Sequence, residues 1–196
     1  MNGFVTERTP PSVKRADGCG GGPDLILTEA AVMLATAMWA FERGASTVDV
    51  HPDGMHVKQF DVAGWLERSG FDKIKCEGKT KHGGVYRRGN HTLGVRFRPG
   101  FGDVVADVGR ERVCVEAKGG CINTKHAGEV SRLRSRMHEA VGSLFDPPED
   151  ASRLIAAVPR TPTTERLGQR MAKRCWRAGI EIALVSTDGS VSLVFA

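Results

Sequence analysis

The sequence has few cysteines, and their spacing matches neither a disulfide framework nor a structural zinc site. Its five cysteines are an odd number, and no two of them form a Cys-x-x-Cys pair. Disulfide frameworks use paired cysteines in oxidising compartments, whereas structural zinc sites use closely spaced ligands. We therefore expect a protein of the reducing cytoplasm.

A long hydrophobic run is also missing. The longest apolar stretch, residues 30–41, has about twelve residues, whereas a membrane-spanning helix needs roughly 20. The chain does not open with a positively charged segment followed by an apolar one. We therefore expect neither a signal peptide nor a membrane partner.

Aromatic side chains are scarce, at 6% of the residues with a single tyrosine. Proteins that bind single-stranded nucleic acid stack its bases on aromatic rings, so this scarcity disfavours recognition of single-stranded RNA. The chain does have 196 residues, 40% of them hydrophobic, and this is enough for the core of one ordinary domain.

The first 23 residues differ in composition from the rest. They are rich in glycine, proline and charge, and they lack hydrophobic periodicity. Their Gly-Cys-Gly-Gly-Gly-Pro string is not followed by the Lys-Ser or Lys-Thr of a phosphate-binding loop. We expect a flexible basic arm over 1–23 and a single domain over 24–196.

Hydrophobic periodicity predicts helices and strands that alternate along the chain. Helices are predicted over 25–43, 62–69, 127–144 and 164–178. Strands are predicted over 47–50, 55–58, 104–108, 113–117, 154–158, 180–186 and 191–195, with further strands within 73–98. This order predicts an α/β sandwich whose central mixed sheet is covered by helices on both faces.

The strands 104–108 and 113–117 are predicted to form a hairpin that places charged side chains opposite one another. Gly109-Arg110 suits a two-residue type II′ turn, and such a turn fixes the register of the two strands. The opposed pairs are then Val108 with Glu111, Asp107 with Arg112, and Asp103 with Glu116. Opposed residues share a face of the sheet, with Cβ atoms roughly 4.5 to 5.5 Å apart.

Asp103 and Glu116 at that separation repel unless a cation lies between them. Mg²⁺ or Mn²⁺ prefers oxygen ligands and is often held by one or two carboxylates, so these two residues and the Ala117 carbonyl are candidate metal ligands. Lys118 shares a face with Glu116 and is a candidate to orient or help deprotonate the attacking water and to stabilise charge on a phosphate. The plain alternative is that Asp103 caps a turn and that Glu116 and Lys118 form an exposed ion pair.

Basic residues gather upstream of this hairpin. From Arg68 to Arg98 there are nine Lys or Arg against two acids, and the net charge of the chain is +5. Such a region suits a polyanion such as DNA, although a solvated basic face is the alternative. The candidate nucleic-acid-binding residues are Lys79, Lys81, Arg87, Arg88, Arg96, Arg98 and, after the hairpin, Lys125.

Asp103 is followed, after twelve intervening residues, by Glu116-Ala117-Lys118, which lie within the string VCVEAKGG. In this motif the chain resembles the PD-(D/E)xK nuclease superfamily. The resemblance implies a restriction-endonuclease-like fold, with Asp103 and Glu116 as metal ligands and Lys118 as the catalytic lysine. Some members add an acid from the first helix, for which Glu29 is the early candidate. Gly102 departs from the family's pattern, because a proline usually precedes the aspartate.

The resemblance also implies a function. It points to a Mg²⁺- or Mn²⁺-dependent endonuclease that hydrolyses DNA in restriction, repair or recombination, and that acts as a homodimer. Two alternatives stay open on the sequence alone. One is a non-catalytic nucleic-acid-binding protein that keeps the fold, and the other is RNA as the substrate.

Overall fold

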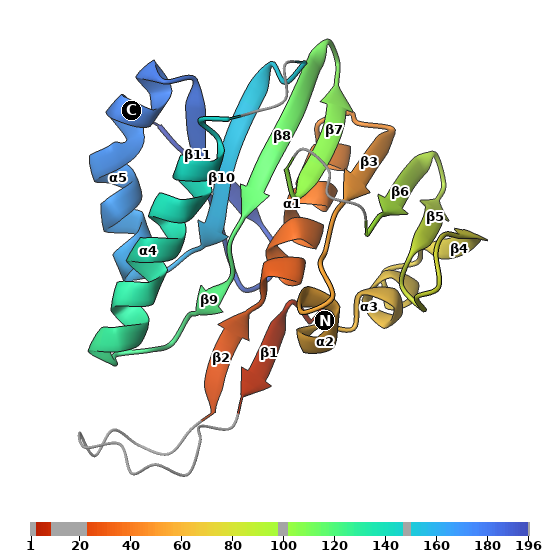
Figure 1. Ribbon diagram of the computed structural model, residues 1–196, viewed down its shortest axis with the longest axis horizontal. Helices are drawn as coiled ribbons and strands as arrows, with labels where there is room; N and C mark the ends of the chain where they lie inside the picture. The colour runs from red at the N-terminus through yellow and green to blue at the C-terminus, as the bar shows by residue number, and fades with distance from the viewer. Residues whose placement is uncertain (1–2, 9–22, 98–101, 147–149, 196) are drawn as a thin grey trace.

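The computed structural model describes residues 3–8, 23–97, 102–146 and 150–195. Within them, a large mixed sheet of nine strands runs in the order β12-β11-β10-β8-β7-β3-β6-β5-β4 (Figure 1). Its strands are β3 (Thr47–Val50), β4 (Asp72–Cys76), β5 (Gly84–Arg88), β6 (His91–Val95), β7 (Val104–Val108), β8 (Glu111–Ala117), β10 (Arg153–Pro159), β11 (Ile180–Val185) and β12 (Val191–Val194). A smaller sheet joins β1 (Val5–Arg8), β2 (Asp24–Leu27) and β9 (Gly120–Cys121).

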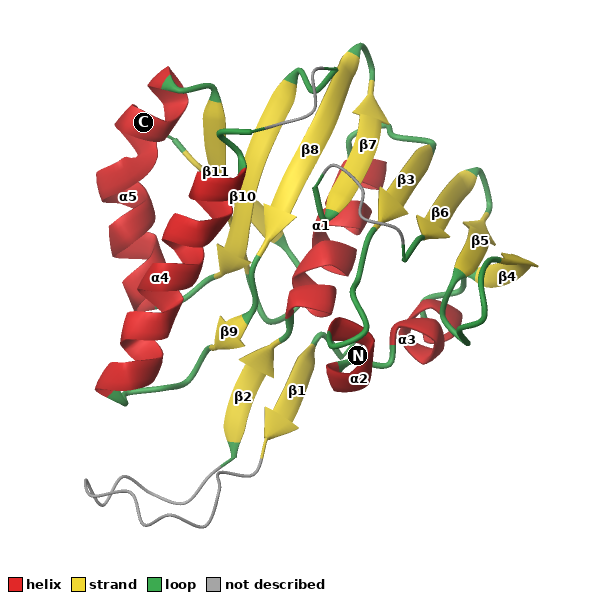
Figure 2. Cartoon of the chain, viewed as in Figure 1, coloured by secondary structure: helices red, strands yellow, loops and turns green. Residues whose placement is uncertain are grey.

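Helices pack against both faces of the large sheet (Figure 2). The five in the described part are α1 (Glu29–Glu42), α2 (His56–Gln59), α3 (Val62–Arg68), α4 (Ala127–Ser143) and α5 (Pro162–Arg177). Buried side chains of α1 and α3 belong to one core cluster with Val113 and Val115 of β8, whereas buried side chains of α4 and α5 belong to a second cluster with Cys114. Because strand side chains alternate between faces, the two helix pairs lie on opposite sides of β8. The predicted α/β class with a mixed sheet is confirmed.

The helix α1 begins later than expected. The prediction placed its start at Leu25, but Leu25 to Leu27 belong to β2. Thr28 is the N-cap, and its Oγ1 accepts a hydrogen bond from Ala31 N at 3.2 Å. The helix contacts the large sheet and α2, and most of its residues are buried, which explains why the sequence is apolar almost all round.

The prediction of a flexible arm over 1–23 is wrong for Val5–Arg8, which form β1. This strand pairs antiparallel with β2, from Val5 opposite Leu27 to Arg8 opposite Asp24. Phe4, just before it, is 4% exposed and belongs to the main core. The burial of Phe4 and the pairing with β2 therefore order this segment, although its composition did not predict an ordered structure. Residues 9–22 of the expected arm lie outside the described residues.

The predicted strand 55–58 is also wrong, because the chain there forms the short helix α2. Asp53 Oδ1 accepts hydrogen bonds from the backbone nitrogens of Met55 and His56, each at 2.8 Å, and so turns the chain into the helix. The strand β3 pairs instead with β6 in parallel and with β7 in antiparallel orientation.

The hairpin of β7 and β8 has the predicted register. Asp107 lies opposite Arg112 and Val108 opposite Glu111, across a turn in which Gly109 has φ +64°. Arg110 does not have a positive φ, which agrees with the expected type II′ turn. Beyond the strand end, Asp103 N donates to Val115 O at 2.8 Å, so the ladder continues toward Glu116.

No helix in the described ranges combines the length and apolar character needed to cross a membrane. The cysteines at 76, 114, 121 and 175 form no disulfide, and three of these four are buried. Burial raises the pKa of Cys114 to about 11, so this thiol is protonated at neutral pH and packs as a small apolar side chain.

Candidate active site

The structure brings Asp103, Glu116 and Lys118 together at one end of the β7–β8 hairpin. Lys118 Nζ lies 3.9 Å from Asp103 Oδ2 and 3.9 Å from Glu116 Oε2. The three side chains are 17% to 19% exposed, so each is mostly withdrawn from solvent but still reachable. The register that the turn imposes accounts for the meeting of the two carboxylates.

The two carboxylates have environments that favour their neutral forms. Burial raises the pKa of Glu116, and the charge of Asp103 raises it further, to about 7. Burial also raises the pKa of Asp103, although Ala117 N donates to Asp103 Oδ2 at 2.8 Å and Lys118 is near. Lys118 alone therefore does not balance the negative charge of this pair, and a second cation would be stabilised here.

Glu29, the early acid in the sequence, joins the same cluster. It is the first residue of α1, and its Oε1 accepts a hydrogen bond from Lys118 Nζ at 3.1 Å. Burial raises the pKa of Glu29, but the hydrogen bond from His56 and the charge of Lys118 outweigh it, so the pKa lies below its usual value. Burial lowers the pKa of Lys118, yet the charges of Glu29, Asp103 and Glu116 raise it above its usual value.

The glycines that follow Lys118 explain how α1 and β8 come so close. A Cβ at Gly119 would lie 2.5 Å from Glu29 N and 2.6 Å from Leu27 O. A Cβ at Gly120 would overlap Leu133 of α4. The neighbours of Gly119 are backbone atoms, so only hydrogen fits there. The chain can therefore leave β8 close to the start of α1, and Lys118 ends beside Glu29.

His56 belongs to the cluster although no sequence signal singled it out. Its Nε2 lies 3.2 Å from Glu29 Oε1, and its Nδ1 accepts a hydrogen bond from Asp53 N at 3.1 Å. Burial lowers the pKa of His56, but its hydrogen bond to Glu29 and the neighbouring carboxylates raise it above its usual value. The short helix α2 places this side chain, and α2 itself was not predicted.

Asp107 and Arg112 behave as the register predicted. Arg112 Nη1 lies 3.6 Å from Asp107 Oδ1, and Arg112 Nε lies 2.9 Å from Asp150 Oδ2. The Asp107 side chain is 73% exposed. It is therefore a member of a surface ion pair on the hairpin and lies outside the cluster around Lys118.

Strand pairings decide which of the candidate nucleic-acid-binding residues lie near this cluster. They place Gly84, Val95, Val50 and Val104 in one row across β5, β6, β3 and β7. The loop 77–83, which precedes Gly84, therefore emerges at the same end of the sheet as Asp103. Lys79 and Lys81 are exposed in this loop, and Lys125 is exposed between β9 and α4.

Arg87 and Arg88 are also candidate nucleic-acid-binding residues, but they lie at the opposite end of β5 from Gly84. Arg88 pairs with His91 beside the β5–β6 turn, roughly 13 Å along the strand from Gly84. Its guanidinium donates to Ser69 O at 3.0 Å and lies over the Phe71 ring.

Arg96 and Arg98 have different outcomes. Arg96 lies at the near end of the sheet, but its guanidinium is held by Asp49 at 2.8 Å and by Glu77 at 2.9 Å. These two carboxylates neutralise its charge, so Arg96 ties β6 to β3 and to the residue that follows β4. Arg98 lies outside the described residues.

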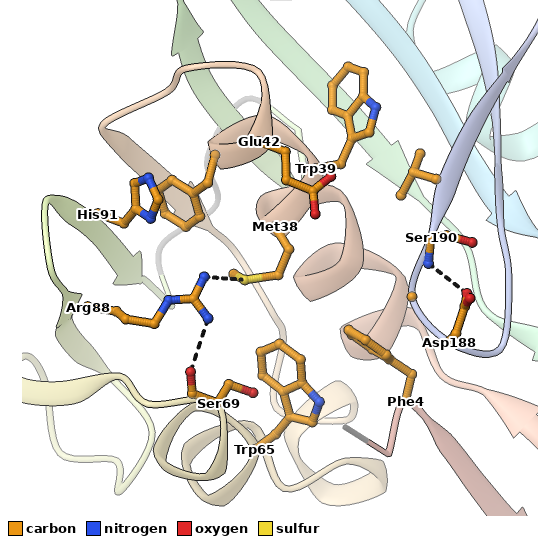
Figure 3. Close-up of a pocket in the computed structure, with 13 residues that line it drawn as sticks. Phe4, Met38, Trp39, Glu42, Trp65, Ser69, Arg88, His91, Asp188 and Ser190 are labelled. Atoms are coloured by element: carbon orange, nitrogen blue, oxygen red, sulfur yellow. Dashed lines mark hydrogen bonds between the residues drawn. The ribbon is translucent and has the colours of Figure 1, made fainter. Parts of the chain in front are cut away.

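Two cavities flank α1. One of about 490 Å³ adjoins the candidate site, with Glu29 and His56 in its wall and β1, β9 and α4 around it. The other, of about 440 Å³, lies at the far end of α1 and is lined by aromatic side chains. Figure 3 shows Arg88 there, pointing toward Met38 and Ser69. None of the three predicted catalytic residues lines this second cavity.

The donor set fits a hard divalent cation held partly by the protein. No group of three or more His, Cys, Asp or Glu residues in the described part is arranged to hold an ion by itself. Mg²⁺ needs only one or two carboxylates, because it keeps several waters and binds substrate phosphates. Asp103 and Glu116 supply that number, and the Ala117 carbonyl stays a predicted third ligand.

Comparison of the chain with models of protein families, with curated proteins and with solved structures found no match.

Proposed function

We propose that this protein is a metal-dependent endonuclease that hydrolyses DNA phosphodiester bonds, with a restriction-endonuclease-like sandwich of the PD-(D/E)xK type. The observation that carries the proposal is the convergence of Asp103, Glu116, Lys118 and Glu29 at the end of one hairpin. Three carboxylates around one lysine are costly to bury unless they serve a bound cation or a reaction.

Asp103 and Glu116 would hold the metal ion, with the Ala117 carbonyl as a further oxygen. A bound Mg²⁺ or Mn²⁺ supplies positive charge that polarises a phosphodiester and favours ionisation of water. The raised pKa of Glu116, about 7, supports this assignment, because a cation at the pair would relieve the repulsion that raises it.

Lys118 would act on the phosphate as a charged donor. Its pKa is raised by the surrounding carboxylates, so the ammonium keeps its proton at neutral pH and is a poor general base. Held at 3.9 Å from both Asp103 and Glu116, it can donate hydrogen bonds to the attacking water or to the developing negative charge on phosphate oxygens.

DNA would approach along the end of the sheet that carries the site. Lys79 and Lys81 lie on one side of it and Lys125 lies on the connection to α4, so phosphates on either side of the cleaved bond meet positive charge. A homodimer would place two such sites on the two strands of a duplex. Sedimentation of the purified protein with and without DNA measures that assembly.

A cleavage assay tests the proposal. The purified protein is incubated with plasmid and with branched DNA, in Mg²⁺ or Mn²⁺, beside the variants Asp103→Ala and Lys118→Ala. We expect both variants to lose about 100-fold or more in rate. Asp107→Ala is the matched control, because Asp107 lies on the same hairpin, forms an exposed ion pair with Arg112 and lies outside the cluster around Lys118. Cleavage by Asp103→Ala at the parent rate would overturn the assignment.

A further inference from the structure

The short helix α2 presents His56 to the carboxylate of Glu29. Glu29 Oε1 lies 3.2 Å from His56 Nε2 and 3.1 Å from Lys118 Nζ, so one oxygen is shared by two donors. The three side chains are 17% to 19% exposed. They form a chain of contacts that runs from α2 through the start of α1 to the end of β8.

We propose that His56 is a positioning residue, which fixes Glu29 so that Glu29 holds Lys118 beside Asp103 and Glu116. This proposal rests on the proposed nuclease function and adds a residue that the hairpin motif does not contain. It also gives Glu29 a role different from metal ligation. Its Oε1 lies within 3.2 Å of the imidazole and the ammonium, whereas Asp103 and Glu116 each lie 3.9 Å from the ammonium.

Hydrogen bonds fix the orientation of the His56 imidazole and determine which ring nitrogen carries its proton. Asp53 N donates to His56 Nδ1 at 3.1 Å, so Nδ1 serves as the acceptor and the proton of the neutral ring is on Nε2. Nδ1 also lies 3.3 Å from Asp53 Oδ1, but that oxygen already accepts the backbone N–H groups of Met55 and His56. His56 therefore donates from Nε2 to Glu29.

Glu29 keeps Lys118 from collapsing onto the carboxylate pair. Lys118 Nζ is 3.1 Å from Glu29 but 3.9 Å from both Asp103 and Glu116. A direct charge-assisted hydrogen bond would be about 2.8 Å long. Without a fixed Glu29, the flexible lysine would move to one of the other carboxylates and compete with a cation there.

The experiment compares His56→Ala, His56→Gln and His56→Asn with the parent. A glutamine amide can place an N–H near the position of Nε2, whereas the shorter asparagine places its amide near Nδ1. His138→Gln is the control, because His138 is exposed on α4. Thermal unfolding of each variant first establishes that it is folded.

The first readout is the ammonium of Lys118 in metal-free, ¹⁵N-labelled protein. A held, mostly buried ammonium exchanges its protons slowly enough to give a ¹H–¹⁵N signal. We expect this signal in the parent, in His56→Gln and in the His138→Gln control, and its loss in His56→Ala and His56→Asn. A signal that is absent from the parent, or that is unchanged in His56→Ala, would overturn the proposal.

The second readout is the rate of DNA cleavage and the affinity for Mn²⁺ alone. Loss of a group that orients a ligand or catalytic side chain typically costs 10- to 100-fold. We expect a loss of that size in His56→Ala and recovery of most of it in His56→Gln. If the parent neither binds Mn²⁺ nor cuts DNA, the nuclease function fails, while the Lys118 signal still decides the role of His56.

Discussion

At the scale of the residue, three carboxylates in one cluster have different pKa shifts. Glu29 has a lowered pKa because two donors, His56 and Lys118, contact its oxygen directly. Glu116 has a raised pKa because burial and Asp103 outweigh a lysine that is 3.9 Å away. The acid best paired with protein donors is thus Glu29, and the least compensated acid is Glu116, where a cation would have most effect.

Glu116→Gln should have a pH-dependent effect on stability. The pKa of Glu116 is about 7 in the folded protein against 4.5 for the free group, so folding favours the protonated form. The stability that this preference contributes is fully present below pH 4.5 and is lost as the pH rises through about 7. Without metal, the variant should match the parent at low pH and exceed its unfolding free energy at pH 8 by on the order of 2 kcal/mol.

Urea unfolding below pH 4.5 and at pH 8, with a chelator present, measures the difference in unfolding free energy between Glu116→Gln and the parent. Added Mg²⁺ should stabilise the parent at pH 8 and leave Glu116→Gln nearly unchanged, because ligand binding to the folded state raises its stability. An equal difference between the two proteins at both pH values would contradict the environment described for Glu116.

Gly119→Ala should damage the site through the backbone. The added methyl would meet Glu29 N and Leu27 O, so the end of β8 must move away from the start of α1. We expect a loss of about 1–3 kcal/mol in unfolding free energy, together with lower cleavage. Gly142→Ala is the control, because a Cβ at Gly142 meets nothing within 4 Å. In the helix α4 it should stabilise the protein by about 0.5–1 kcal/mol.

At the scale of the element, local signals predicted some parts and missed others. The helix α4 (Ala127–Ser143) matches a prediction over 127–144, and the hairpin register follows from Gly109. The strand β1 was missed because it depends on pairing with β2, from which residues 9–23 separate it in the sequence. The helix α2 was missed because four residues carry no periodicity, and contacts of Asp53 decide its shape.

The same distinction applies to the candidate site. Asp103, Glu116 and Lys118 could be predicted together because they lie on one hairpin, where spacing determines which side chains meet. Glu29 could be named only as an early acid, because its contact with Lys118 depends on how α1 packs against β8. His56 could not be found, since its place depends on α2 packing against α1, which no spacing in the sequence encodes.

The helix α5 offers a test of element stability away from the site. Thr161 caps it, and its Oγ1 accepts a hydrogen bond from Thr164 N at 3.1 Å, with Pro162 at the first helical position. Thr161→Ala should lower the unfolding free energy by about 1–2 kcal/mol. Ser135→Ala, at an exposed position within α4, is the control and should change it by less than about 0.5 kcal/mol. Equal effects in urea unfolding would contradict the cap.

At the scale of the whole molecule, the basic side chains fall into two groups: those held by partners within the protein and those exposed near the site. Arg96 and Arg112 are held by neighbouring acids in the strands and loops, and Arg88 packs at the far end of α1. Lys79 and Lys81 are exposed at the end of the sheet that carries the site. The basic region of the sequence is therefore partly structural, and only some of its residues are placed to meet a polyanion near Lys118.

Replacing Lys79 and Lys81 together by alanine should weaken DNA binding and its salt dependence. Each lost phosphate contact lowers the slope of log affinity against log salt by about 0.9 for duplex DNA. Fluorescence anisotropy over a salt series, in Ca²⁺ to prevent cleavage, measures both quantities. Arg87→Ala removes an exposed charge at the opposite end of β5 and should change them little. A larger effect from Arg87→Ala would place the DNA elsewhere.

The proposed function depends on a site for a divalent cation at Asp103 and Glu116. Calorimetric titration of the metal-free protein with Mn²⁺ measures this binding, with Asp103→Asn, Glu116→Gln and the control Asp107→Asn titrated beside the parent. The parent and Asp107→Asn should bind Mn²⁺ alike, whereas Asp103→Asn and Glu116→Gln should each lose most of the affinity. Binding that is unchanged in Asp103→Asn and Glu116→Gln would show that the cation does not bind at these two carboxylates.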